Sequence, residues 1–136
     1  VARALDDGSA FQRFERWIAA QGGDVTALGD LPLAPGQQQI TADRSGVITA
    51  LEARAIGRAA GLLGGGRSRK DESLDHGVGV LLHAKVGDEV TAGEAVATLY
   101  HRDSKGLAAA AAAVTGAIAI GDAASSEPLV IETGLA

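Results

Sequence analysis

Apolar residues near the N-terminus recur at the spacing of an amphipathic helix. Four of them fall on one helical face: Phe11, Phe14, Trp17 and Ile18. Ser9, followed three residues later by Gln12, predicts a capping box at the helix start, and Gly22 predicts its end. Residues 1–7 read as the end of a preceding helix. Both phenylalanines and the single tryptophan lie on this face, so we expect it to pack against other apolar residues.

Residues 24–39 read as a connector, because they contain Pro32 and Pro35 and show no strong hydrophobic periodicity. We therefore place the main boundary here. The prediction is a helical stub over residues 1–36 and a second domain over residues 37–136.

Short apolar runs bounded by turn residues predict strands in the second domain. They cover residues 47–51, 77–83, 95–100, 117–120 and 129–132. Of these, residues 77–83 read as a buried strand. Two helices are expected. One is indicated by helical spacing of apolar residues and ends at the glycines 64–66; these residues are Ala55, Ile56, Ala59, Leu62 and Leu63. The other covers residues 105–114 and is capped by Asp103 or Ser104. The pattern is α+β, with short strands outnumbering helices.

Composition narrows the class of protein. The 136 residues, 46% hydrophobic and 21% charged, suit one globular domain with or without a stub of another. The net charge of −5 argues against binding to nucleic acid or anionic membranes. The chain lacks cysteine, and its longest near-apolar run, residues 107–114, is too short to span a bilayer. It also lacks methionine and begins at Val1, so we expect a processed chain or a piece of a longer, cytoplasmic protein.

Residues 61–68 almost match a phosphate-binding P-loop, with Arg67 in place of the lysine. A P-loop follows a strand and opens a helix, whereas here a helix precedes and a charged loop follows. The pattern favours a helix end and an exposed loop.

The basic cluster after these glycines is unusual in an acidic chain. It comprises Gly65, Gly66, Arg67, Ser68, Arg69 and Lys70. Such a loop could face an anionic ligand such as phosphate. The alternative is a solvated loop whose charges pair with Asp71, Glu72 and Asp75.

Histidine chemistry has little support in the sequence. Asp75 next to His76 could orient an imidazole for base catalysis, but an adjacent pair is not specific. His83 and His101 each lie at the end of a predicted strand, without the spacing of a zinc site, so no metal is expected. His83 is better explained as a core or edge residue.

The most patterned stretch is residues 85–96, which read V-x-G-D-x-V-x-x-G-E-x-V from Val86 and predict two tight turns between short strands. This resembles half of a biotinyl/lipoyl-type barrel sandwich. In carrier domains a lysine follows at a hairpin tip, which would fall near Arg102 and Asp103. Lys105 is displaced from that position, so we expect the fold element without the swinging-arm function.

Several segments in order resemble the C-terminal domain of thymidine phosphorylases and related pyrimidine-nucleoside phosphorylases. These segments are residues 44–50, 55–60, 63–67, 74–79 and 83–88, preceded by residues 14–18 and 21–24. The resemblance covers essentially the whole chain. It implies that residues 1–36 are a stub of a central α/β lobe and that residues 37–136 are the C-terminal domain.

The resemblance implies a pentosyltransferase parent of pyrimidine metabolism. Such enzymes are homodimers that use inorganic phosphate to cleave a pyrimidine nucleoside, giving free base and (deoxy)ribose 1-phosphate. Their phosphate-binding loop, Lys-His-Ser signature and pyrimidine-holding residues lie in the N-terminal lobes, so no catalytic residue is carried over to this chain. Residues 64–70 correspond to a mobile glycine-arginine loop, which implies a role in lobe closure or subunit contact.

Two further hypotheses remain open at this stage. One is a free-standing barrel-sandwich binding module without a carrier lysine. The other is a regulatory or oligomerisation fragment.

Overall fold

The computed structural model describes residues 2–67 and 69–124. The backbone divides into two compact units, Val1–Pro32 and Leu33–Ala136. The predicted strand at residues 129–132 lies outside the described residues. The roles assigned to residues 1–36 and 37–136 stay predictions.

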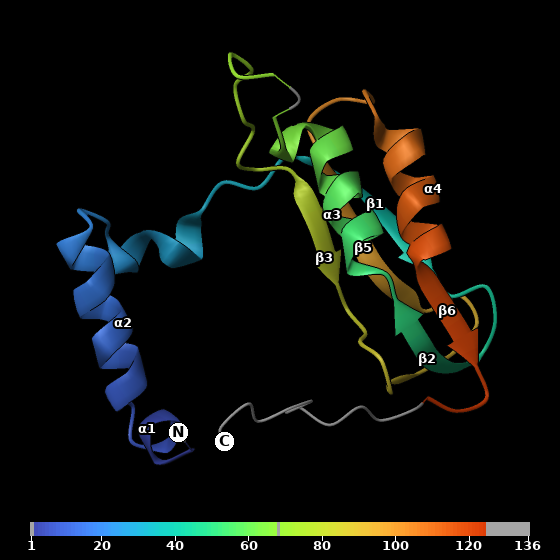
Figure 1. Cartoon of the computed structure of the whole chain (residues 1–136), viewed down its shortest axis with the longest axis horizontal. Helices are drawn as coiled ribbons and strands as arrows, with labels where there is room; N and C mark the ends of the chain where they lie inside the picture. Colours follow the sequence, from blue (N-terminus) through green and yellow to red (C-terminus); the bar gives the residue numbers. More distant parts are fainter. Residues whose placement is uncertain (1, 68, 125–136) are drawn as a thin grey trace, which may run out of the picture. The chain divides into compact units, whose positions relative to one another are not determined.

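The first unit contains helices α1 (Ala2–Asp6) and α2 (Ser9–Ala20) and a 3₁₀ helix η1 (Val25–Asp30) (Figure 1). The predicted capping box of α2 is wrong. Gly8, at φ 75°, takes the N-cap position, and Ser9 is already helical, with no side-chain bond at the cap. The Ser9 N–H instead donates to the Asp7 carboxylate at 2.9 Å. A preceding aspartate and glycine therefore start this helix.

The aromatic face of α2 (Phe11, Phe14 and Trp17) forms as predicted, with ring centroids of neighbouring aromatics 6.1 Å and 6.3 Å apart. Its expected packing is not found within the first unit. Phe11 is 57% exposed and Trp17 is 59% exposed, and none of the residues described in α1, α2 and η1 is buried.

The second unit is α+β, as predicted from the sequence. One antiparallel sheet has the order β1-β5-β3, from β1 (Gly36–Thr41), β5 (Ala95–His101) and β3 (Gly79–Leu82). The other has the order β4-β2-β6, from β4 (Glu89–Val90), β2 (Gly46–Leu51) and β6 (Ile118–Gly121). These are short strands in open three-stranded sheets, and closure into a barrel sandwich stays a prediction.

Two helices cover the strands of this unit. Helix α3 (Ala53–Ala60) continues into a π-helical turn η2 (Gly61–Gly65), and α4 (Leu107–Ala117) lies beside α3 (Figure 1). Four small residues on these helices are buried: Ala55, Ala59, Ala110 and Ala117. Small side chains at a helix contact allow a short distance between the axes, which explains the alanine-rich composition of both helices.

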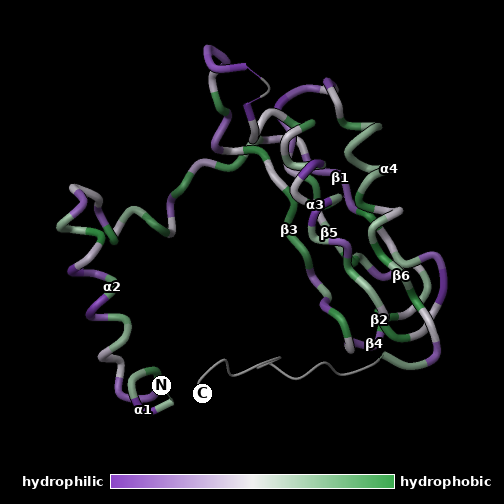
Figure 2. The backbone as a smooth tube through the Cα atoms, viewed as in Figure 1, coloured by the Kyte–Doolittle hydropathy of each residue, from purple (hydrophilic) through white to green (hydrophobic). Residues whose placement is uncertain are grey.

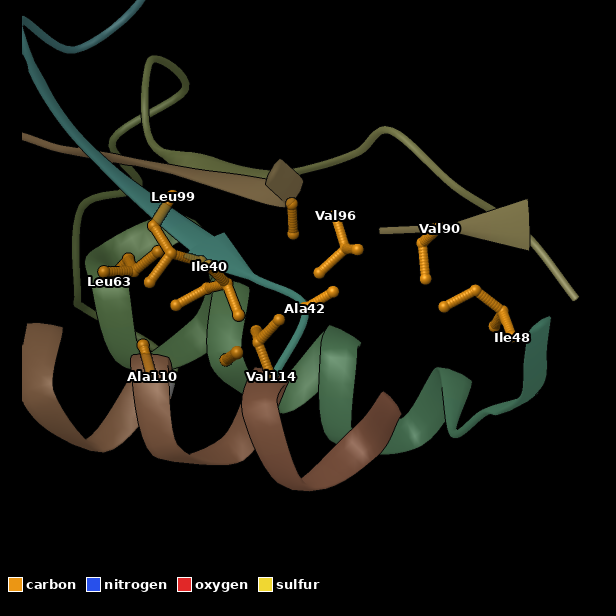
Figure 3. Packing of buried hydrophobic residues seen from close by; sticks show 11 residues of the cluster. Ile40, Ala42, Ile48, Leu63, Val90, Val96, Leu99, Ala110 and Val114 are labelled. Atoms are coloured by element: carbon orange, nitrogen blue, oxygen red, sulfur yellow. The ribbon is translucent and has the colours of Figure 1, made fainter. Parts of the chain in front are cut away.

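The core lies between the helices and the strands (Figure 3). Its largest fully buried side chains are Ile48 of β2, Leu99 of β5 and Val114 of α4. The core therefore joins residues far apart in the sequence, and each comes from a segment that the sequence predicts as a strand or helix.

Strand β3 differs from its prediction as a buried strand. Among the described strands it lies at the edge of its sheet, paired with β5, and Leu81 and Leu82 are 47% and 37% exposed. The apolar run predicts burial on both faces, but at the edge of this sheet part of its surface faces solvent.

Helix α4 begins two residues later than predicted. Asp103 accepts a hydrogen bond from the Lys105 N–H at 2.9 Å, as a cap would, but the helix starts only after Gly106. Gly106 has φ 72°, and a Cβ placed on it would lie 2.1 Å from the Leu62 carbonyl oxygen. Only glycine fits this close approach, so η2 and the start of α4 are in direct contact at Leu62 and Gly106.

The two turns predicted from the V-x-G-D-x-V-x-x-G-E-x-V pattern are confirmed. Asp88 accepts from the Lys85 N–H at 3.0 Å, and Glu94 accepts from the Thr91 N–H at 2.8 Å. In both turns a carboxylate accepts from the backbone three residues earlier, across a glycine with positive φ.

Candidate functional site

The charged segment between η2 and β3, residues 66–74, is named the basic loop here, and it is the hydrophilic stretch that follows η2 in Figure 2. Arg67, Arg69 and Lys70 are exposed on it, and Ser68 lies outside the described residues. Within the loop, the Arg69 N–H donates to the Glu72 carboxylate at 3.1 Å. The loop therefore exposes its cationic side chains, and their role towards an anionic ligand stays a prediction.

The order of elements around the loop does not suit a P-loop. Helix α3 and η2 precede it, and β3 follows it. Gly65 and Gly66 therefore lie at a helix C-terminus, where unsatisfied groups are carbonyls and the dipole is negative. A phosphate would need the opposite end of a helix.

Asp75, which follows the basic loop, is bonded to three segments. Its backbone N–H donates to the Gly64 carbonyl at 3.1 Å, and its Oδ1 accepts from the Gly77 N–H at 2.9 Å. Arg102 donates twice to the carboxylate, from Nε to Oδ2 at 2.5 Å and from Nη2 to Oδ1 at 3.1 Å. We call this arrangement the Asp75 junction.

The junction explains the charge state of Asp75. Hydrogen bonds from Arg102, and then from the Gly77 N–H, lower the pKa of the Asp75 carboxyl to about 2. The hydrogen bond to Asp75, and then the Asp75 charge, raise the pKa of Arg102 in turn. Asp75 is therefore ionised at neutral pH, with both oxygens used by Arg102, and in the described part of the chain no hydrogen bond joins it to His76. The acid–base pair considered from the sequence is not formed.

The other two histidines are engaged locally. His83 Nε2 lies 2.8 Å from Thr98 Oγ1, across the β3–β5 pair, and His101 Nδ1 lies 2.9 Å from the Asp103 carbonyl oxygen. His83 is thus an edge residue, one of the two roles expected for it. Among residues 2–67 and 69–124, no three His, Asp or Glu side chains are grouped to hold a metal ion.

Sequence reasoning missed the role of Arg102. It was singled out only as the place where a carrier lysine would fall. The register of β3 with β5 sets Gly79 opposite Tyr100, so continuing the pair by two residues sets Gly77 opposite Arg102. The proximity of Arg102 to the Asp75 segment can therefore be predicted only when the register of the two strands is known.

An apolar groove of about 230 Å³ lies beside β3. Its walls include Leu33, His76, Leu81 and Tyr100. His76 and Gly77, which line this groove, directly follow Asp75 in the chain.

Among the described residues, no helix has both the length and the apolar character needed to cross a membrane.

The second unit has the architecture of a known class of domain. The pyrimidine nucleoside phosphorylase C-terminal domain family matches residues 47–121, from β2 to β6. The chain belongs to this family.

Curated relatives are longer than this chain. A thymidine phosphorylase of Mycobacterium tuberculosis (strain ATCC 25618 / H37Rv) is 39% identical over 132 residues, which cover 96% of this chain and 30% of the relative. A pyrimidine-nucleoside phosphorylase of Geobacillus stearothermophilus is 42% identical over 103 residues, 74% of this chain and 24% of the relative. One from Bacillus subtilis (strain 168) is 39% identical over 103 residues. The chain therefore spans less than a third of the length of these relatives.

Proposed function

We propose that this chain is the C-terminal, non-catalytic part of a thymidine or pyrimidine-nucleoside phosphorylase. The main observation is the match to the C-terminal domain family. The Mycobacterium relative supports it, because the alignment covers 96% of this chain but only 30% of the relative. The parent is a pentosyltransferase: a pyrimidine nucleoside and inorganic phosphate give the free base and (deoxy)ribose 1-phosphate.

The chemistry of this reaction supports placing catalysis elsewhere. The bond from C1′ to the base nitrogen breaks as a bond from C1′ to a phosphate oxygen forms, so the enzyme must hold an anion and stabilise an oxocarbenium-like charge. Here the cations of the basic loop are exposed at a helix C-terminus, and Arg102 is committed to Asp75. We assign both substrates to the lobes that precede this domain, in a homodimeric cytoplasmic enzyme.

The aromatic face of α2 supports a contact with those lobes. A helix with this stripe normally buries it, yet Phe11 and Trp17 are more than half exposed within their own unit. The match to the Mycobacterium relative leaves only a few residues of this chain unaligned, so it includes α2, and 70% of the relative lies outside the match. The proposed partner of this face is that remaining part of the same polypeptide.

We assign the basic loop to lobe closure or subunit contact. Its exposed cations, Arg67, Arg69 and Lys70, stand on a loop whose two ends are tied at the Asp75 junction. Such a loop can present charge to an anion or an acidic surface brought against it.

A chimaera tests the proposal. The C-terminal part of the Mycobacterium relative that aligns with this chain is replaced by this chain, and phosphorolysis of thymidine is measured. We expect activity in the chimaera and none in this chain alone or in the relative truncated before the replaced part.

A matched pair of variants tests the α2 contact in the chimaera. Trp17→Ser should lower activity or assembly, whereas Arg13→Ser, a change at an exposed polar position of the same helix, should not. Turnover of thymidine by this chain alone would contradict the non-catalytic role.

A second candidate is a free-standing binding module of the barrel-sandwich type, favoured by the two confirmed turns around Gly87 and Gly93. It requires no phosphorylase lobes. An inactive chimaera that is folded and dimeric would favour this candidate.

A further inference from the structure

The Asp75 junction closes the basic loop at its base. Gly64, just before the end of η2, and Asp75, just after the loop, are joined by the hydrogen bond from Asp75 N–H to the Gly64 carbonyl. The segment between them, of which residues 65–67 and 69–74 are described, therefore has adjacent ends, as an Ω-loop does. The direction in which this loop leaves the domain is therefore decided at Asp75.

Arg102 supplies the contact from outside the loop. It follows β5, and its fork-like pair of bonds to one carboxylate fixes the orientation of both side chains better than a single bond would. The segment that carries Arg102 is itself held, because Gly106 is packed directly on the Leu62 carbonyl of η2. The loop is thus tied to a segment that itself contacts η2.

We propose that Asp75 and Arg102 are a positioning pair that fixes the place at which the basic loop presents its cations. The loop's use in the reaction rests on the function proposed above, whereas its position is a property of this chain.

Because the Asp75–Arg102 pair is exposed, its effect on the position of the loop can be distinguished from an effect on the stability of the domain. The side chains of Arg102 and Asp75 are 56% and 28% exposed, and ion pairs in water contribute little to global stability. The core that stabilises this unit lies elsewhere, around Ile48, Leu99 and Val114. Loss of the pair should change the geometry of the loop much more than the unfolding midpoint.

The chain contains no cysteine, so two introduced cysteines can carry spin labels without background. We place them at Asp71 in the basic loop and at Arg54 in α3, both exposed, and measure the distance distribution between the labels. The variants are Asp75→Asn, Arg102→Gln and the reversed pair Asp75→Arg with Arg102→Asp. Lys105→Gln is the matched control, because it removes an exposed cation from the same segment as Arg102.

We expect one narrow distribution in the parent chain and in Lys105→Gln. Asp75→Asn and Arg102→Gln should each broaden or shift it, with the thermal midpoint nearly unchanged, and the reversed pair should narrow it again. Unchanged distributions in both single variants would overturn the proposal, as would an equal change in Lys105→Gln. If Asp75→Asn does not fold, Arg102→Gln and Arg102→Lys decide the result, because the Arg102 side chain is more than half exposed.

The same variants in the chimaera test how the loop is used. We expect Asp75→Asn and Arg102→Gln to lower kcat/KM several-fold at constant thermal midpoint, and Lys105→Gln to leave it unchanged. A loosened loop with unchanged kinetics would overturn a positioning role in the reaction. An inactive parent chimaera would instead count against the proposed function, and the distance measurement would still decide whether the pair positions the loop.

Discussion

Gly106 lies so close to Leu62 that a Cβ added to it would be 2.1 Å from the Leu62 carbonyl oxygen. The contact brings the start of α4 against η2, and Gly106 also has the positive φ of 72° that glycine tolerates. We predict that Gly106→Ala destabilises the domain by about 2 kcal/mol or more, from backbone strain together with the displacement of Leu62. Urea unfolding of the purified chain measures this.

Gly116 is the matched control. It lies inside α4, and a Cβ there would meet no atom within 4 Å. Gly116→Ala should therefore raise stability by about 0.5–1 kcal/mol, because alanine favours a helix more than glycine does. Equal effects of the two changes would contradict the contact between Gly106 and Leu62.

Truncation of Leu99 should lower the free energy of unfolding more than truncation of Trp17, although the tryptophan side chain is larger. Leu99 is fully buried, so Leu99→Ala should cost about 2–5 kcal/mol through lost contacts and a cavity. Trp17 is 59% exposed, and Trp17→Ala should change the free energy of unfolding by no more than about 0.5 kcal/mol in the isolated chain. Circular dichroism during denaturation measures both, and a large cost for Trp17→Ala would mean that α2 is packed within this chain.

The elements that could be predicted from the sequence are those fixed by residues close together in the chain. A glycine followed by a carboxylate specifies each turn, at Asp88 and Glu94, because the hydrogen bond spans only three residues. Helix α3 followed from the spacing of Ala55 and Ala59, which are both buried.

Other features depend on partners distant in the sequence. Strand β1 fell partly within the predicted connector because three consecutive glutamines hide its alternation, and its pairing with β5 spans about sixty residues of chain. The exposure of β3 depends on its place at the sheet edge, and the Asp75–Arg102 pair depends on the register of β3 with β5. Neither is visible in a single segment.

The Asp75 junction predicts a defined pH window. The folded pKa of Asp75, about 2, is below its ordinary value of 3.8, because Arg102 and the Gly77 N–H bind the charged form. Its contribution to stability is therefore fully present above about pH 4 and is lost as the pH falls through about 2. Because the pair is exposed, this contribution is small, and the shift is measured directly: the carboxyl carbon of Asp75, followed by NMR in the folded chain, should titrate with a midpoint of about 2.

Arg102→Gln provides the control for the pH series. It removes the largest cause of the lowered pKa, so the midpoint of Asp75 in Arg102→Gln should move up towards the ordinary value of 3.8. A midpoint of Asp75 at the ordinary value of 3.8 in the parent chain would contradict the lowered pKa.

The turn carboxylates give the last prediction. Asp88 and Glu94 each accept a backbone N–H that would otherwise lose its partner, so Asp88→Ala or Glu94→Ala should lower the free energy of unfolding by about 1 kcal/mol. Asp88→Asn keeps an acceptor oxygen and should cost less, and Glu89→Ala, at the exposed position next to Asp88, serves as the neighbour control. Hydrogen exchange at the Lys85 and Thr91 amides locates each effect, because exchange should accelerate only in the turn whose carboxylate is removed. Acceleration in both turns from a single change would mean that the turns open together and are not separately held.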